Sequence, residues 1–162
     1  MLRLTPWLLC LFSPAICAAS CWDEAAARYE VSPLLLKAIA WKESRGWTHA
    51  MGPQLPGGHR ALGLMQINSI HLPTLRGFGI SREHLFDACV SQHVAAWILA
   101  KCMNQVGSSW KAVGCYYAGP ASKNIAAQAQ YVLDVQRIYQ GYQEQEKKIL
   151  DTQSPGIAYR VE

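Results

Sequence analysis

The stretch Ser32–Gly46, SPLLLKAIAWKESRG, carries its own signals for the beginning and the end of a helix. Ser32 can act as an N-cap whose hydroxyl accepts a hydrogen bond from the first turn, and Pro33 suits the first helical position because its ring fixes φ in the helical range. Gly46 is a typical residue at a helix end, since it tolerates the left-handed backbone conformation. We therefore predict a helix over residues 34–45.

The chain on both sides of this helix has a mainly helical pattern. We predict a helix from Ser91 to Val106, in which Val94, Ile98, Cys102 and Val106 recur every fourth residue on one face. This spacing indicates a stripe that faces a core rather than a site. Residues 50–63 are rich in glycine and proline, so we predict an irregular loop or a short hairpin there. Further helices are expected at Cys21–Glu30, Leu64–Ser69, after a capping Ser81, Trp110–Tyr117 and Ile125–Tyr142.

Composition favours one globular, mainly α domain over residues 20–143, followed by a polar and mobile tail over residues 144–162. The 162 residues are 51% hydrophobic and 16% charged, which excludes an intrinsically disordered chain. No apolar run reaches the length of a membrane-spanning helix. The net charge is +4, and no basic run is longer than Lys147-Lys148, so we expect no nucleic-acid partner.

Residues 1–19 have the pattern of a secretory signal peptide. Arg3 precedes the short apolar block Trp7–Phe12, and small residues end at Ala19, after which cleavage is expected. A buried N-terminal helix is the alternative, which two prolines weaken. A second alternative is a lipoprotein signal, to which Ala18–Cys21 would belong. Export by a cleavable signal predicts a location in the periplasm.

Export changes the meaning of the cysteines, because an oxidising compartment favours disulfides. Four cysteines remain after the predicted cleavage, an even number that fits two disulfides in any of three pairings. A zinc site is the competing interpretation. The sequence has no C-x-x-C motif, and the spacings of 68, 13 and 13 residues match no common ligand pattern, so we expect no metal. The four are Cys21, Cys89, Cys102 and Cys115.

Glu43 is the first candidate for catalysis. It lies four residues after Ile39 and eight after Leu35, so it extends the apolar stripe of its helix. A carboxyl group in such a place is partly desolvated, which raises its pKa toward the value that a general acid needs near neutral pH. The alternative is a solvated glutamate at a helix end, beside Lys42 and Arg45.

The sequence from Ser44 to Arg82 contains no aspartate or glutamate. Ordinary glycosidases use two carboxylates, so a cleft walled by this stretch would leave Glu43 without a second one. Gln66 and Asn68 offer amides that could bind sugar hydroxyls and N-acetyl groups, or could satisfy loop backbone instead.

Other chemistries lack their signatures. The histidines stand 9 to 13 residues apart, with no pair at helical spacing, and we read each as a surface or loop residue. No nucleophile elbow and no phosphate-binding glycine loop occurs. The histidines are His49, His59, His71, His84 and His93.

Four short motifs in order carry a family resemblance. They are Glu43-Ser44, Gly63–Asn68 (GLMQIN), Cys115–Gly119 (CYYAG) and Tyr131–Val135 (YVLDV). From about residue 21 to 141, the chain resembles the soluble lytic transglycosylase family. It is most similar to the small exported members that accompany conjugative type IV and type III secretion machines.

The resemblance implies a lysozyme-like, mainly α fold of a single domain and no cofactor. It implies an enzyme that cleaves the β-1,4 bond between N-acetylmuramic acid and N-acetylglucosamine in peptidoglycan. A single glutamate would protonate the leaving oxygen and then take a proton from the muramyl C6 hydroxyl, closing a 1,6-anhydro ring. The implied partners are peptidoglycan strands and components of a secretion or conjugation machine, and we expect a monomer.

The resemblance also assigns site residues by position. Glu43 becomes the acid and base, and the substrate-side residues are Ser44, Met65, Gln66, Asn68, Tyr116 and Tyr131. Ser44 would support local hydrogen bonds, Met65, Gln66 and Asn68 would line the cleft, and the two tyrosines would lie near the glutamate. Core packing is the alternative for both tyrosines.

Two departures from the family pattern stand out in the third motif. It usually reads Ala-Tyr-Asn and here reads Cys115-Tyr116-Tyr117, which removes one asparagine. The resemblance pairs Cys21 with Cys89, and Cys102–Cys115 then forms a second bridge between successive helices.

Two other functions remain open. One is a hydrolytic, lysozyme-like muramidase, which would use water instead of the C6 hydroxyl. The other is a wall-binding assembly component with little catalysis, to which Tyr117 and the polar tail point.

Overall fold

The computed structural model describes residues 19–108 and 110–153, and its fold is mainly α, as the sequence predicts. The predicted signal peptide, apart from Ala19, and residues 154–162 lie outside the described residues. The six α-helices of the described part are α1 (Cys21–Tyr29), α2 (Pro33–Ser44), α3 (Leu72–Arg76), α4 (Ala88–Val106), α5 (Trp110–Ala118) and α6 (Ile125–Gln153). None of these helices is long and apolar enough to cross a membrane.

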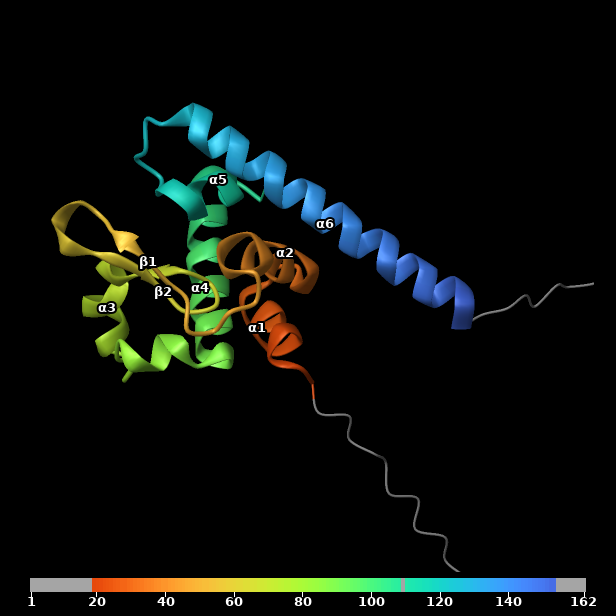
Figure 1. Cartoon of the computed structure of the whole chain (residues 1–162), viewed down its shortest axis with the longest axis horizontal. Helices are drawn as coiled ribbons and strands as arrows, with labels where there is room; N and C mark the ends of the chain where they lie inside the picture. The colour runs from red at the N-terminus through yellow and green to blue at the C-terminus, as the bar shows by residue number, and fades with distance from the viewer. Residues whose placement is uncertain (1–18, 109, 154–162) are drawn as a thin grey trace, which may run out of the picture.

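A small antiparallel sheet with the order β1-β2-β3 lies between α2 and α4 in the chain. Its strands are β1 (Met51–Gln54), β2 (Arg60–Leu62) and β3 (Ile67–Asn68), and 3-10 turns occur at η1 (Pro56–Gly58), η2 (Ser69–His71) and η3 (Glu83–Phe86). β1 and β2 form the hairpin expected around residues 50–63. Figure 1 shows α4 in the middle of the molecule, with the sheet and α3 on one side and α1 and α2 on the other.

Helix α2 begins as its sequence predicts, but it ends at Ser44, one residue before the predicted end, with Arg45 rather than Gly46 as its cap. Ser32 Oγ accepts a hydrogen bond from the Leu35 N–H at 3.2 Å, and Pro33 occupies the first turn. At the other end Arg45 adopts the left-handed conformation with φ 56°, and its N–H donates to the Trp41 carbonyl at 3.1 Å. This places Glu43 in the last turn of the helix, next to the sheet-bearing loop.

The core forms around α4, whose apolar stripe is buried as predicted except at Val106, which is only partly buried. Val94, Ile98 and Cys102 are all at most 9% exposed. They pack with fully buried side chains from the other helices and from β2 and β3, so one core joins the helices to the sheet. Those side chains include Leu36, Ile39, Leu62, Leu75, Val113 and Val135.

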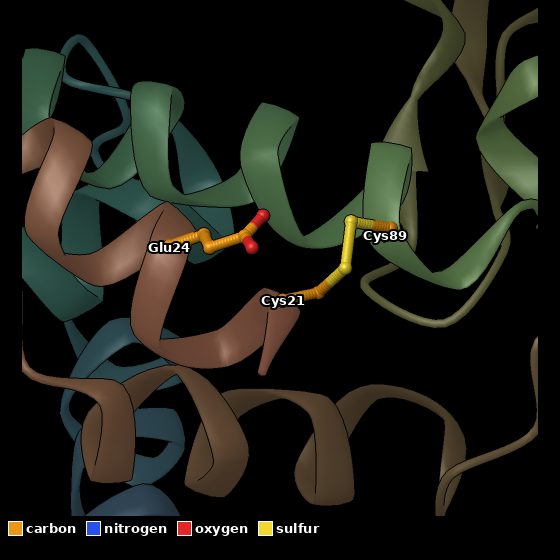
Figure 2. A group of neighbouring side chains, drawn as sticks. All are labelled: Cys21, Glu24 and Cys89. Atoms are coloured by element: carbon orange, nitrogen blue, oxygen red, sulfur yellow. A yellow bond between two sulfur atoms is a disulfide. The ribbon is translucent and has the colours of Figure 1, made fainter. Parts of the chain in front are cut away.

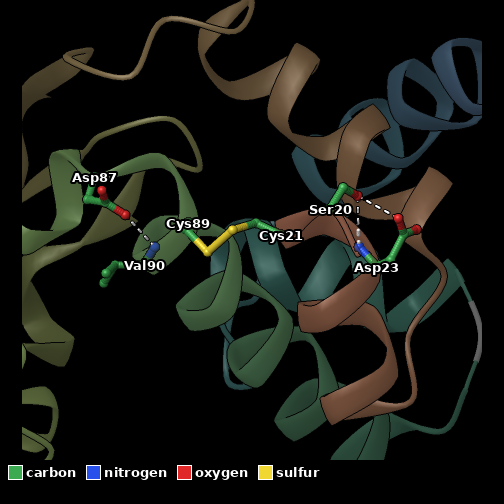
Figure 3. Close-up of a disulfide and its surroundings, with 6 residues drawn as sticks. All are labelled: Ser20, Cys21, Asp23, Asp87, Cys89 and Val90. Carbon is green, nitrogen blue, oxygen red and sulfur yellow. Dashed lines mark hydrogen bonds between the residues drawn. A yellow bond between two sulfur atoms is a disulfide. The ribbon is translucent and has the colours of Figure 1, made fainter. Parts of the chain in front are cut away.

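Two disulfides tie helices to one another. Cys21–Cys89 joins the N-terminal ends of α1 and α4, and Cys102–Cys115 joins α4 to α5. Figure 3 shows that the first lies between two capped helix ends: the Ser20 hydroxyl accepts from the Asp23 N–H, and the Asp87 carboxylate accepts from the Val90 N–H at 2.9 Å. The pairings are those that the resemblance implied.

The helix predicted over Leu64–Ser69 is wrong. The segment is a tight turn followed by β3, which pairs with β2. Gly63 has φ +73°, and a Cβ there would lie 1.9 Å from the Leu85 carbonyl oxygen, so only glycine fits. Gln66 also has a positive φ of 48°. These two left-handed residues turn the chain back onto the sheet before a helix can begin.

Ser81 does not cap a regular helix. Its hydroxyl donates to the Glu83 carboxylate at 2.6 Å, and a short 3-10 turn follows. The long helix α4 then begins at Ala88 behind the Asp87 cap, three residues before the predicted start at Ser91.

Helix α6 runs well past the predicted end at Tyr142. Residues 144–153, expected in a mobile polar tail, continue the helix to Gln153 with exposed side chains. The segment is rich in Glu, Gln and Lys, which are good helix formers and need no buried face to extend a helix that is already formed. In Figure 1 this end of α6 projects away from the rest of the domain.

Candidate active site

Glu43 is a partly buried carboxyl group that faces α6 from the last turn of α2. The Tyr131 hydroxyl donates to its Oε1 at 2.5 Å. Burial raises the pKa of Glu43 to about 7, while the hydrogen bond from Tyr131 and the positive charge of Lys42 oppose that rise. Glu43 is therefore held close to the balance between its acidic and its basic form at neutral pH.

Lys42, although adjacent in sequence, is engaged elsewhere. Its Nζ lies 2.6 Å from the Asp134 carboxylate on α6, which also accepts a hydrogen bond from Gln130 and lies 3.5 Å from Arg137. The ion pair fixes the end of α2 against α6. It also leaves Tyr131 as the direct hydrogen-bond partner of Glu43.

Two further tyrosines, both on α5, line the same cavity as Glu43. The Tyr116 hydroxyl donates to the Met65 carbonyl at 2.8 Å and so ties α5 to the turn before β3. Burial and the nearby charge of Glu43 raise the pKa of both Tyr116 and Tyr131 well above its usual range. Both hydroxyls therefore remain neutral donors. Tyr117 is half exposed, and its ring stacks on that of Tyr131.

Glu43 lines a cleft of about 190 Å³ between α2, the sheet and α5, and it is the only acidic residue among the lining side chains. A second cavity of about 350 Å³ continues from it, because five residues line both. No acidic residue lines this second cavity. The shared residues are Asn68, His71, Ile98, Tyr116 and Tyr117.

The amides of the second motif line the cleft and also satisfy local backbone. Gln66 Nε2 donates to the Gly63 carbonyl at 2.9 Å and to the Ala50 carbonyl at 3.2 Å. Asn68 Oδ1 accepts from the Ile70 N–H at 3.0 Å, which caps η2. Both amides therefore satisfy local backbone, which was one of the two uses expected for them, while their residues also line the cleft.

Two of the expected site residues, Ser44 and Met65, do not line the cleft but support the turn that carries the second motif. Ser44 Oγ donates to the Leu64 carbonyl at 2.7 Å, which connects the end of α2 to the turn that carries the second motif. The Met65 side chain is fully buried, in contrast to the expectation that it lines the cleft. Its carbonyl, by accepting from Tyr116, is the part of the residue that supports the site.

His71 and Ile98 also line the cleft, although the sequence did not predict it. Burial lowers the pKa of His71, with the charge of Lys101 acting in the same direction, so His71 is a neutral group at neutral pH. Its position three residues after Asn68 was the only signal in the sequence. Ile98 was assigned to the core stripe, and a residue at the edge of a core stripe can also line a cleft.

One group of side chains in the described residues has the spacing of a metal site, but its chemistry does not fit. Figure 2 shows Cys21, Glu24 and Cys89 close together, with both sulfur atoms in the disulfide bond. A disulfide sulfur is not a thiolate and cannot act as a strong metal ligand. A cavity of about 600 Å³ between α1, α3 and α4 lies apart from Glu43 and shares no lining residue with the cleft.

The chain is similar in sequence to several known proteins. Residues 20–138 match the transglycosylase SLT domain. The chain is 41% identical over 133 residues to protein IpgF of Shigella flexneri, covering 82% of this chain and 86% of that protein. It is 41% identical over 142 residues to X polypeptide of Escherichia coli K12, covering 83% of each. Invasion protein IagB of Salmonella typhimurium is 39% identical over 125 residues, or 76% of each chain.

Proposed function

The chain belongs to the transglycosylase SLT domain family, and from that premise we propose that it is a peptidoglycan lytic transglycosylase that uses Glu43 as its single acid and base. The observation that carries the proposal is the partly buried Glu43, with a pKa near 7, as the only carboxyl group lining its cleft. The bond cleaved is the β-1,4 linkage from N-acetylmuramic acid to N-acetylglucosamine.

In the first step, the protonated Glu43 carboxyl donates its proton to the glycosidic oxygen as the bond to C1 of the muramyl residue breaks. A pKa near 7 keeps a large share of Glu43 protonated at neutral pH, which is what a general acid requires. Tyr131 donates a hydrogen bond to the carboxylate that this step produces, so the charge does not develop without a partner.

In the second step, the Glu43 carboxylate removes the proton of the muramyl C6 hydroxyl. The C6 oxygen forms a bond to C1, and the product carries a 1,6-anhydro ring. The proton given in the first step is replaced, so Glu43 returns to its starting form. The attacking oxygen belongs to the substrate, and the reaction therefore needs no second carboxylate.

A hydrolytic muramidase is the alternative, in which water attacks C1. Lysozyme-like glycosidases that use water usually place a second carboxylate across the cleft. Neither cavity contributes one. The absence of a second carboxylate among these lining residues favours attack by the substrate hydroxyl.

We place the enzyme in the periplasm after removal of residues 1–19, where it would open the wall locally for a secretion or conjugation apparatus. Two disulfides suit an oxidising compartment. One relative is named an invasion protein, which accords with a role beside such an apparatus. The partners are glycan strands and components of that apparatus.

The direct test digests purified sacculi and separates the released muropeptides. We expect anhydro-muropeptides from the wild type and none from Glu43→Gln, which keeps the shape of the side chain and removes the acid. Glu146→Gln, the same substitution at an exposed position on α6, is the matched control and should retain activity. Reducing-end products from the wild type would favour the muramidase. Cleavage that persists in Glu43→Gln would exclude Glu43 as the acid, and no cleavage by any form would favour the wall-binding component.

A further inference from the structure

Tyr117 is the residue at which the third motif departs most from its family pattern, and the structure gives it a specific neighbour. Its ring centroid lies 4.6 Å from that of Tyr131, with the two planes 16° apart. This is the geometry of a stacked aromatic pair. The pair joins α5 to α6 beside the cleft that Tyr117 lines.

The stacked ring belongs to the residue that holds Glu43. Tyr131 can donate to Glu43 Oε1 only while the long axis of its ring points at the carboxyl group, since the hydroxyl lies at the far end of that axis. Tyr131 is 4% exposed whereas Tyr117 is 50% exposed, so the stack covers one side of the inner ring with the outer one. Nothing comparable could come from an asparagine, whose small amide has no ring to stack.

We propose that Tyr117 is a positioning residue, whose ring holds Tyr131 in the orientation that directs its hydroxyl to Glu43. The kinetic part of this inference rests on the proposed function, whereas its structural part does not. The Tyr117 hydroxyl takes no part in the stack, so a phenylalanine ring should serve equally well. The positioning acts through Tyr131 and needs no contact between Tyr117 and the substrate.

The charged and titratable groups near the Glu43 carboxyl determine whether loss of the stack raises or lowers the pKa of Glu43. They are Lys42 on α2, Tyr116 on α5 and Tyr131 on α6, with Asp134 behind Lys42. The hydrogen bond from Tyr131 stabilises the charged form of Glu43 and lowers its pKa. Loss of the stack loosens this bond, so the pKa of Glu43 rises and the alkaline limb of the pH–rate profile moves to higher pH.

A double-mutant cycle separates positioning from direct substrate contact. Tyr117→Ala and Tyr117→Asn should lower kcat by roughly 3- to 10-fold with little change in KM, because an aromatic stack of ordinary strength is lost. Tyr117→Phe should restore most of kcat. In a Tyr131→Phe background, which has no hydroxyl to position, Tyr117→Ala should change kcat by less than about 2-fold.

Two results would overturn the proposal. A full effect of Tyr117→Ala in the Tyr131→Phe background would show that Tyr117 acts on something other than the Tyr131 hydroxyl. A rise in KM without a fall in kcat would assign it to substrate binding. Thermal unfolding of each variant, with the exposed Phe78→Ala as a control far from the cleft, identifies any variant that fails to fold. Tyr117→Asn then serves in place of Tyr117→Ala.

A readout independent of activity separates this inference from the proposed function. The Glu43 carboxyl carbon can be followed by NMR in protein labelled at glutamate, with Glu43→Gln identifying its signal. We expect its titration midpoint to move upward in Tyr117→Ala and to stay in place in Tyr117→Phe. If the wild type released no anhydro product but this shift occurred, the proposed function would fail and the positioning role would stand. An unchanged midpoint in Tyr117→Ala would overturn the positioning role.

Discussion

Replacing Glu43 by glutamine should stabilise the folded protein increasingly as pH rises. Burial raises the pKa of Glu43 from 4.5 to about 7 in the folded state, so folding disfavours its charged form. One pKa unit corresponds to about 1.4 kcal/mol, and the full penalty is therefore about 3 kcal/mol above the folded pKa. Glutamine fills the same space without a charge and escapes this penalty.

The direction in which the stability of the wild type changes with pH follows from the protonation of Glu43 in the folded and in the unfolded chain. Below the unfolded pKa the carboxyl group is neutral in both the folded and the unfolded chain, so no penalty acts. Between pH 4.5 and about 7 the unfolded chain loses the Glu43 proton while the folded chain still keeps it, so the wild type loses stability as pH rises through this window. The advantage of Glu43→Gln should therefore grow from about pH 4 and level off above about pH 7.

Urea unfolding at a series of pH values, with disulfides intact, measures this advantage. Only the change with pH in the difference between the two unfolding free energies is used. Any effect of the substitution that does not depend on pH, such as a change in packing, therefore cancels. We expect the difference in unfolding free energy between Glu43→Gln and the wild type to increase by about 3 kcal/mol over this range. A difference that does not change with pH would show that Glu43 is solvated, and the reasoning about its acid role would fail.

Three other changes test separate parts of the site and the fold. Tyr131→Phe removes a hydrogen bond to the Glu43 carboxylate, so the alkaline limb of the pH–rate profile for muropeptide release should move above about pH 7. Asp134→Asn should move the same limb downward, because Lys42 without its carboxylate partner favours the charged form of Glu43 more strongly. An upward movement would contradict this. Replacing both cysteines of Cys102–Cys115 by alanine should lower the unfolding free energy in urea by roughly 3 kcal/mol. This is the value expected when a disulfide closes a loop with a sequence separation of 13. Free thiols in the unreduced wild type would remove the basis of that expectation.

The sequence predicts those parts of the fold whose signals are local. Ser32 and Pro33 begin α2 as expected because capping depends on neighbouring residues, and the buried stripe of α4 follows from its spacing. The segment after Gly63 was predicted wrongly, since its left-handed turn needs a glycine against the Leu85 carbonyl, which comes from a distant part of the chain. No local propensity reports such a contact.

In the candidate site, too, the features with a local sequence signal were predictable, and those that depend on long-range packing were not. The spacing of Glu43 after Ile39 indicates a partly buried carboxyl group, and the structure places it so. The hydrogen bond from Tyr131 joins residues 88 positions apart, and the sequence suggests it only through the family resemblance. The stack of Tyr117 on Tyr131 has no sequence signal, because it depends on how α5 and α6 pack.

The central claim is that Glu43 works alone and that the attacking oxygen comes from the substrate. Digestion of sacculi in water enriched in heavy oxygen, followed by mass spectrometry of the muropeptides, tests it most directly. We expect products that are one water lighter than reducing-end muropeptides and that contain no heavy oxygen at the new end. Reducing-end muropeptides carrying the heavy isotope would show that water attacks C1, which would contradict the claim.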